Sequence, residues 1–264
     1  MEQRERRTYL IRALLEEDPR YGPLEIPEDS GEQKRLLRGL MNVRPAAPMR
    51  QEFRRIQDAY LREENRRRGV VKLSDLSPIE GDLYLWRGDI TCFACGAIVN
   101  AANSGMTGCY QPCHNCIDNC IHTYAGIQLR SACNEIMERQ GHEEPPGQAK
   151  ITPAFNLPCQ YVIHTVGPIV QGRLTNRHRE LLASCYRSCL DLAREYRIDS
   201  IAFCCISTGV FSFPNEPAAE IAVETVRDWK DRTQSGMKVI FNVFQEKDQG
   251  IYRRILDRHS KTPA

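Results

Sequence analysis

From residue 83 onward the chain alternates short β-rich runs with longer helical patterns, and this alternation restricts the fold to few classes. Runs typical of strands lie at residues 82–91, 97–102, 160–167, 200–207 and 238–244. Apolar residues at helical spacing fill residues 117–139, 177–197, 217–232 and 248–259. This order predicts an α/β domain of three layers, α/β/α, in which a mostly parallel, mixed central sheet lies between helices.

The first 78 residues have a different pattern, which predicts a helical N-terminal extension. Apolar side chains recur at helical spacing in residues 7–17 and 49–68, and a Pro/Gly-rich loop at residues 19–33 separates the two segments. The run Arg66–Arg68 could contact phosphate, but we interpret it as a solvated helix end. We therefore divide the chain into an extension, 1–78, and a domain, 79–264.

Charge and hydropathy exclude several classes of partner. The 36 Lys and Arg residues nearly cancel 34 Asp and Glu residues, so no global field attracts nucleic acid or an anionic membrane. No apolar run has the length of a signal peptide or a membrane span. We expect a soluble, cytoplasmic protein whose twelve cysteines are reduced, because a chain of this length does not need a disulfide scaffold.

The stretch GCYQPCHNC, residues 108–116, concentrates potential metal ligands. Thiolate sulfur and imidazole nitrogen are ligands that zinc prefers, and three protein ligands leave a fourth tetrahedral position open for chemistry. Four thiolates, from Cys109, Cys113, Cys116 and Cys120, would instead form a closed structural zinc or iron–sulfur site. The segment PCHNC also fits half of the zinc deaminase signature, but no H-x-E precedes it, and the one at 142–144 follows it in the chain, which disfavours that class.

Several motifs together resemble the macrodomain family, whose members bind ADP-ribose. They are GDIT at 88–91, NAAN at 100–103, VIHTVGP at 162–168 and STGVFSFP at 207–214, and the resemblance covers residues 82 to about 250. Cys109, His114 and Cys116, together with the helical extension, resemble more narrowly the zinc-dependent macrodomains associated with sirtuin-like ADP-ribosyltransferases. That subfamily is implied to remove ADP-ribose from acidic side chains of proteins, including a lipoyl-carrier protein.

The resemblance also implies roles for individual residues. Asp89 and Ile90 would contact adenine, Asn103 the distal ribose, and Phe211 would pack near that ribose. Backbone groups around the diphosphate or distal ribose would come from Ile117, Asp118, Asn119, Ser207, Thr208, Gly209 and Val210. Without the resemblance, these residues would be interpreted as turn residues, a helix cap, an ordinary strand-to-loop junction and a core aromatic.

We therefore predict a zinc-dependent hydrolase that releases mono-ADP-ribose from acidic residues of a modified protein. The candidate metal ligands are Cys109, His114 and Cys116, and these with Asn103 are the candidate catalytic residues. Asn100, His122 and His164 lie in apolar patterns and are expected to be structural. The alternatives are a non-catalytic ADP-ribose reader with a structural metal, and a metal-stabilised interaction module that binds no nucleotide.

Overall fold

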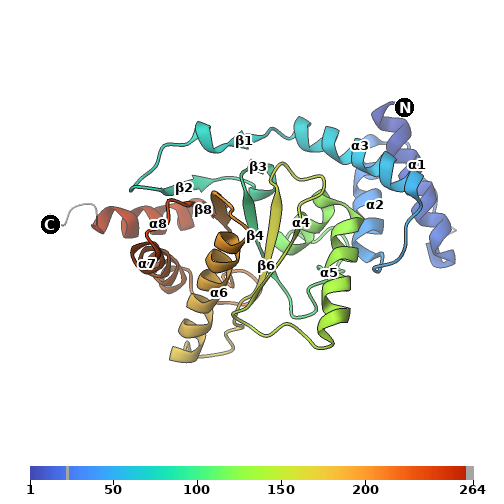
Figure 1. Ribbon diagram of the computed structural model, residues 1–264. Coiled ribbons are helices and arrows are strands. Elements are labelled where there is room, and N and C mark those ends of the chain that lie inside the picture. Colours follow the sequence, from blue (N-terminus) through green and yellow to red (C-terminus); the bar gives the residue numbers. More distant parts are fainter. Residues whose placement is uncertain (22–23, 260–264) are drawn as a thin grey trace.

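The computed structural model describes residues 1–21 and 24–259, and at its centre lies a six-stranded sheet with helices on both faces (Figure 1). The strand order is β2-β8-β7-β4-β6-β5, and every neighbouring pair is parallel except β5 with β6. The strands are β2 Leu83–Arg87, β4 Ala97–Ala102, β5 Ala149–Pro153, β6 Tyr161–Val166, β7 Ser200–Phe203 and β8 Lys238–Val243. The predicted α/β class with a mostly parallel, mixed sheet is confirmed.

Helices α4 and α5 cover one face of the sheet, and α6, α7 and α8 cover the other (Figure 1). Their bounds are α4 Ile117–Ala125, α5 Ile127–Gln140, α6 Asn176–Glu195, α7 Asn215–Thr233 and α8 Glu246–His259. Because both faces are covered, the central strands are apolar almost throughout, as in β4, where Ile98 and Val99 are fully buried. The single helix expected at 117–139 is wrong, because Gly126, at φ 98°, divides it into α4 and α5.

Three helices form the N-terminal extension, α1 Gln3–Glu17, α2 Ser30–Val43 and α3 Gln51–Arg67. They enclose a small apolar core of their own, to which Ile127 of α5 also belongs, so the extension packs on the α4 and α5 side of the domain. The sequence interpretation missed α2, which begins inside the expected loop. The Asp29 side chain caps it by accepting a hydrogen bond from the Glu32 N–H at 2.8 Å.

A short parallel pair connects the extension to the domain. Strand β1, Val71–Lys72, pairs with β3, Phe93–Ala94, and short 3₁₀ turns lie at Pro19–Tyr21, Leu73–Asp75 and Ile90–Cys92. Strand β1 lies before residue 79 in the sequence, yet its partner belongs to the domain. The segment that joins the extension to the domain is therefore hydrogen-bonded to the domain and is not a free linker.

The carboxyl ends of β2, β8, β7, β4 and β6 lie at one edge of the sheet, because these strands are parallel. Strands β4 and β7 are neighbours, but the chain leaves β4 toward α4 on one face and leaves β7 toward α7 on the other. Ligands bind at such a switch point in open α/β sheets. The loops after β4 and β7 contain the predicted Cys/His segment and the predicted phosphate loop.

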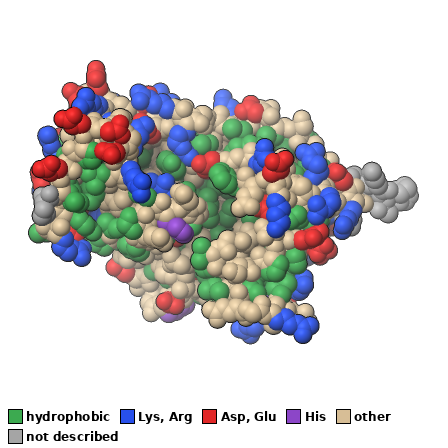
Figure 2. Space-filling model, turned by 180° about the vertical axis from the view of Figure 1, so that it is seen from behind, with side chains coloured by type: hydrophobic (Ala, Val, Ile, Leu, Met, Phe, Trp, Pro, Cys, Tyr) green, Lys and Arg blue, Asp and Glu red, His purple; other side chains and the backbone are tan. Residues whose placement is uncertain are grey.

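The surface has no broad area of one charge on the face shown in Figure 2, where acidic and basic side chains are interspersed. Among the described residues, no helix is long and apolar enough to cross a membrane. The near balance of charge in the sequence is thus also a local balance on this face.

Candidate active site

The loop after β4 brings Cys109, His114 and Cys116 together. Their ligand atoms all lie within 4.8 Å of one another, and Cys109 Sγ is 3.6 Å from His114 Nδ1. A tetrahedral zinc with ordinary bond lengths places a sulfur and a nitrogen ligand about 3.6 Å apart. The donor atoms and this spacing therefore fit a zinc ion held by three protein ligands.

The other two cysteines of this segment bond elsewhere. Cys113 Sγ donates to the backbone carbonyl of Arg35 at 3.3 Å, and Cys120 Sγ lies 3.6 Å from a guanidinium nitrogen of Arg38. Neither belongs to the group of converging ligand atoms. The geometry favours the open three-ligand arrangement over the closed four-thiolate one. All twelve cysteines are free thiols.

Helix α4 begins directly at this cluster. Cys116 is its N-cap, and its Sγ accepts a hydrogen bond from the Asn119 N–H at 3.4 Å. Asp118, in the first turn, is buried and accepts from Asn100 Nδ2 at 2.8 Å. Burial raises the pKa of Asp118 to about 6, and the hydrogen bond from Asn100 opposes that rise. Asp118 therefore connects the start of α4 to strand β4 rather than capping the helix.

Asn103 fixes the first turn of the loop. Its Oδ1 accepts from the Gly105 N–H at 3.0 Å, while its Nδ2 donates to the Gly108 carbonyl at 3.1 Å and to Asp118 at 3.3 Å. Both amide hydrogens are thus engaged within the protein. An amide oxygen has two lone pairs, and the Gly105 N–H uses one of those of Oδ1. The turn-stabilising role is observed, and contact with a ribose stays a prediction.

His122 and His164 lie beneath the loop and, as expected, are buried. Asn100 Nδ2 lies 3.1 Å from His164 Nδ1, and Thr152 Oγ1 lies 2.9 Å from His164 Nε2. Burial lowers the pKa of His164 to about 3 and that of His122 well below its usual value. With Cys133 these residues form a second close group of potential ligands, but both nitrogens of His164 already have partners. We interpret His164 as a neutral group that supports Asn100, whereas neither ring nitrogen of the buried His122 has a hydrogen-bond partner among the described residues.

At the far end of the sheet edge, the Asp89 carboxylate is held by two neighbours. Its Oδ1 accepts from the N–H of Thr91 at 2.9 Å, and Arg68 donates to its Oδ2. The Arg68 guanidinium also bonds to Thr91 Oγ1 at 2.8 Å and stacks 3.4 Å above the Tyr124 ring. Strand β2 ends at Arg87, so Asp89 caps the following 3₁₀ turn, which starts at the buried Ile90, instead of ending the strand.

The interpretation of Arg66–Arg68 as a solvated helix end needs correction. Arg66 and Arg67 are exposed and pair with Glu63, as expected for a solvated face. Arg68 turns inward to Asp89, and its side chain is only 22% exposed. The extension thus contributes a charged group to the edge where the predicted adenine contact lies.

Phe244 is an exposed aromatic at this edge that the sequence interpretation left without a role. It follows β8 directly and is 76% exposed, although the strand before it is buried. Arg87 and Val243 are paired in register, and the Gly88 N–H donates to the Val243 carbonyl at 3.0 Å. Phe244 therefore lies beside the segment that carries Asp89. An aromatic placed immediately after a buried strand was the signal that could have identified it.

The predicted phosphate loop, residues 207–211, follows β7. Ser207 has φ 65°, and its buried Oγ has no hydrogen-bond partner among the described residues. A Cβ at Gly167 would lie 2.0 Å from that oxygen, so a larger residue there would displace the Ser207 side chain. The Val170 N–H donates to the Phe211 carbonyl at 2.9 Å, which ties the two loops together, and Val210 is 73% exposed.

Two further hydrogen bonds stabilise the rest of this loop. Thr208 Oγ1 donates to the Cys205 carbonyl at 3.0 Å, and the Ser212 N–H donates to the carbonyl of Gly209, also at 3.0 Å. The Phe211 side chain is half-buried, so it is neither a pure core aromatic nor a free one. An orphaned buried hydroxyl beside exposed loop backbone suits an oxygen-rich ligand.

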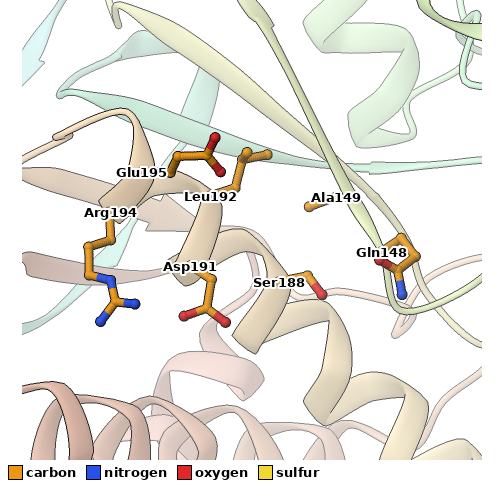
Figure 3. Close-up of a pocket in the computed structure, with 7 residues that line it drawn as sticks. All are labelled: Gln148, Ala149, Ser188, Asp191, Leu192, Arg194 and Glu195. Carbon is orange, nitrogen blue, oxygen red and sulfur yellow. The ribbon is translucent and has the colours of Figure 1, made fainter.

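A cavity of about 470 Å³ lies between α6 and the start of β5 (Figure 3). It is lined by Gln148, Ala149, Ser188, Asp191, Leu192, Arg194 and Glu195. None of the predicted site residues lines it. Asp191 already accepts from Trp229 Nε1 at 2.8 Å, and Ser188 donates to the Gly147 carbonyl at 2.7 Å. These bonds give Asp191 and Ser188 partners within the protein.

Comparison with known proteins gives consistent matches. The Macro domain family matches residues 99–222. A protein-ADP-ribose hydrolase of Treponema medium is 62% identical over 260 residues, which is 97% of this chain and all of that protein. A Fusarium oxysporum f. sp. cubense protein named "probable bifunctional ADP-ribose hydrolase/ADP-ribosyltransferase" is 40% identical over 86% of this chain and 42% of its own length. The structure of a Trypanosoma brucei macrodomain in complex with ADP-ribose superposes with a TM-score of 0.65, at 29% identity, over 79% of this chain and 91% of that one.

Proposed function

This chain belongs to the macrodomain family and is a hydrolase, and on that premise we propose that it releases mono-ADP-ribose from acidic side chains of a modified protein in a zinc-dependent reaction. The observation that carries the proposal is the convergence of Cys109, His114 and Cys116 at the carboxyl edge of the sheet, beside Asn103. Relatives named as protein-ADP-ribose hydrolases support the reaction class. The zinc dependence and the acidic linkage are our own inference.

The proposed ligand would extend along the carboxyl edge of the sheet. Adenine would lie between the Asp89–Ile90 segment and the exposed ring of Phe244, since an aromatic face and a carboxylate acceptor suit a base that carries an amino group. The diphosphate would lie between residues 207–211 and the N-terminal turn of α4, whose N–H groups favour an anion. The distal ribose would then reach Asn103 and the Cys/His cluster.

Cys109, His114 and Cys116 would hold the zinc ion. Bound there, zinc would supply Lewis acidity toward a distal-ribose oxygen or lower the pKa of water to about 7. The contribution of the protein's own residues is to fix the geometry of the loop. Asn103 and Asp118 hold the start of the loop against α4, and a zinc ion held by these three ligands would have one coordination position that the protein does not fill.

A specific partner follows from the sequence resemblance. We propose a lipoyl-carrier protein as one modified substrate and a sirtuin-like ADP-ribosyltransferase as the enzyme that modifies it. The Fusarium relative, named for both hydrolase and transferase activities, supports a functional link between removal and attachment of ADP-ribose. A cytoplasmic location stays a prediction.

The test is to incubate the protein with one carrier that bears mono-ADP-ribose on acidic side chains and with another that bears it on arginine. We expect free ADP-ribose to appear from the first carrier only. Release from the arginine-linked carrier alone would refute the acidic linkage. Binding of the first carrier without any release would favour the non-catalytic reader.

A further inference from the structure

We propose that helix α2 of the N-terminal extension is a working part of this site, and that Arg38 positions the Cys/His loop for metal. This inference rests on the proposed function, because it concerns how the same loop is held. It gives the extension a role that its separate apolar core alone does not explain.

Beyond its first turn, which Asn103 fixes, the loop has little internal structure. Within residues 103–116 the backbone bonds in the described structure are the turn from the Met106 N–H to the Asn103 carbonyl and a weak bond from the His114 N–H to the Gln111 carbonyl at 3.3 Å. Cys113 has φ 55°, a left-handed conformation that a cysteine adopts only when its surroundings impose it. The conformation of the loop must therefore come from neighbouring elements.

Arg38 provides the principal external contact. One of its guanidinium nitrogens donates to the backbone carbonyl of His114 at 2.7 Å and to Asn119 Oδ1 at 3.0 Å. Asn119, which is fully buried, connects Arg38 to two further points of the loop. Its Nδ2 donates to the carbonyls of Gln111 at 2.9 Å and Cys109 at 3.3 Å. Arg38 thus holds the backbone directly at His114 and, through Asn119, indirectly at Cys109.

Asn42, one turn further along α2, holds the middle of the loop. Its Oδ1 accepts from the Cys113 N–H at 2.9 Å, and its Nδ2 donates to Thr123 Oγ1 of α4 at 2.9 Å. Arg130 of α5 completes the frame by donating to the carbonyls of Thr107 at 2.7 Å and Asn42 at 2.8 Å. The loop is therefore clamped between α2 and the start of α4.

These contacts should raise metal affinity, because ligands that are already ordered lose less conformational entropy when they bind. Removing partners that orient metal ligands typically costs about ten- to a hundredfold in metal affinity. The opposite sign is expected if Arg38 acts only through its charge, since removing a positive charge should strengthen binding of a cation. The sign of the effect therefore separates positioning from electrostatics.

The experiment measures zinc affinity by competition with a chromophoric chelator for wild type, Arg38→Ala, Arg38→Lys and Arg35→Ala. Arg35 is the matched control, because it is exposed on the same helix and bonds to the loop only through its backbone carbonyl. We expect Arg38→Ala to lose about ten- to a hundredfold. Arg38→Lys, which keeps the charge but not the planar donor geometry, should lose less, and Arg35→Ala should match wild type.

Turnover in excess zinc provides a second readout. Excess zinc should restore the activity of Arg38→Ala, whereas a variant that had merely unfolded would not recover. Unchanged or increased zinc affinity in Arg38→Ala, with wild type binding zinc, would overturn the positioning role alone. Should Arg38→Ala fail to fold, wild-type zinc affinity in Arg38→Met, which keeps the apolar stem and has no donor, would overturn it equally. A wild type that binds no zinc would instead remove the proposed metal, and this inference with it.

Discussion

The Arg68 guanidinium, from the end of the N-terminal extension, donates a hydrogen bond to the Asp89 carboxylate at the edge of the domain's sheet. The two residues are far apart in sequence, and neither side chain is fully exposed. Through Arg68 the extension contacts the adenine end of the proposed ligand site. Through Arg38 it contacts the Cys/His loop at the opposite end. The extension thus contacts both the proposed adenine region and the Cys/His loop.

Asp89→Ala should weaken ADP-ribose binding without affecting metal. The change removes the proposed acceptor for the adenine amino group and leaves a donor without a partner, which costs about 1–3 kcal/mol. Titration calorimetry measures the affinity, and metal analysis of the same sample provides the control. Wild-type affinity for ADP-ribose would refute the adenine assignment.

Arg68→Ala should weaken ADP-ribose binding by less than Asp89→Ala does. The carboxylate remains, but it loses the guanidinium that fixes its orientation, and the stacking on Tyr124 is lost as well. Arg67→Ala is the control, because Arg67 lies next in the chain and pairs only with acidic residues of its own helix. Equal effects of Arg68→Ala and Arg67→Ala on the affinity for ADP-ribose would show that Arg68 does not orient Asp89 for binding.

Much of the fold could be predicted because buried strands and helices have recognisable patterns of apolar residues in the sequence. Strands β4 and β8 are mostly apolar, each interrupted by one buried asparagine, since helices cover both faces of the sheet. Helix α2 was missed because its first turn, from Ser30 to Gln33, is polar and glycine-containing and resembles the preceding loop. The break at Gly126 was missed because a glycine inside a helical pattern is often tolerated.

The candidate site could be predicted only in part, for a related reason. Cys109, His114 and Cys116 are close in sequence, so their convergence was visible as a motif. Arg38 and Arg68 act across long sequence separations, and nothing in their local pattern distinguishes them from the solvated arginines nearby. Such contacts are set by how the extension packs, which periodicity does not specify.

Cys109→Ala, His114→Ala and Cys116→Ala should each lose zinc and hydrolase activity, because each removes one of three proposed ligands. Cys113→Ala and Cys120→Ala should keep both, since their thiols contact α2 and not the cluster. Circular dichroism should show folded protein throughout, because a sheet core of this size does not depend on metal. Loss of zinc from the Cys113 or Cys120 variant would favour the closed four-thiolate site.

His164 should make the folded protein sensitive to acid. Burial lowers the pKa of its imidazole to about 3, against about 6.5 in the unfolded chain. The unfolded state therefore binds more protons between these values, so stability present above pH 6.5 is lost as the pH falls toward 3. His164→Gln should be less stable than wild type at pH 8, because buried hydrogen bonds to Asn100 and Thr152 are disturbed.

The prediction concerns the difference in unfolding free energy between wild type and His164→Gln. Each pKa unit corresponds to about 1.4 kcal/mol, so the stability gap between wild type and His164→Gln should narrow by about 2–3 kcal/mol from pH 6.5 to pH 4.5. Urea unfolding at several pH values gives both free energies. A gap that does not change with pH would mean that the buried imidazole takes up a proton in the folded protein.

The most direct test of the central claim is turnover of a protein that carries mono-ADP-ribose on an acidic side chain, measured before chelation, after chelation and after zinc is returned. We predict that chelation abolishes release of ADP-ribose, that zinc restores it, and that the Cys116→Ala variant releases none under any of the three conditions. Release that continues at the original rate in metal-free wild-type protein would contradict the account.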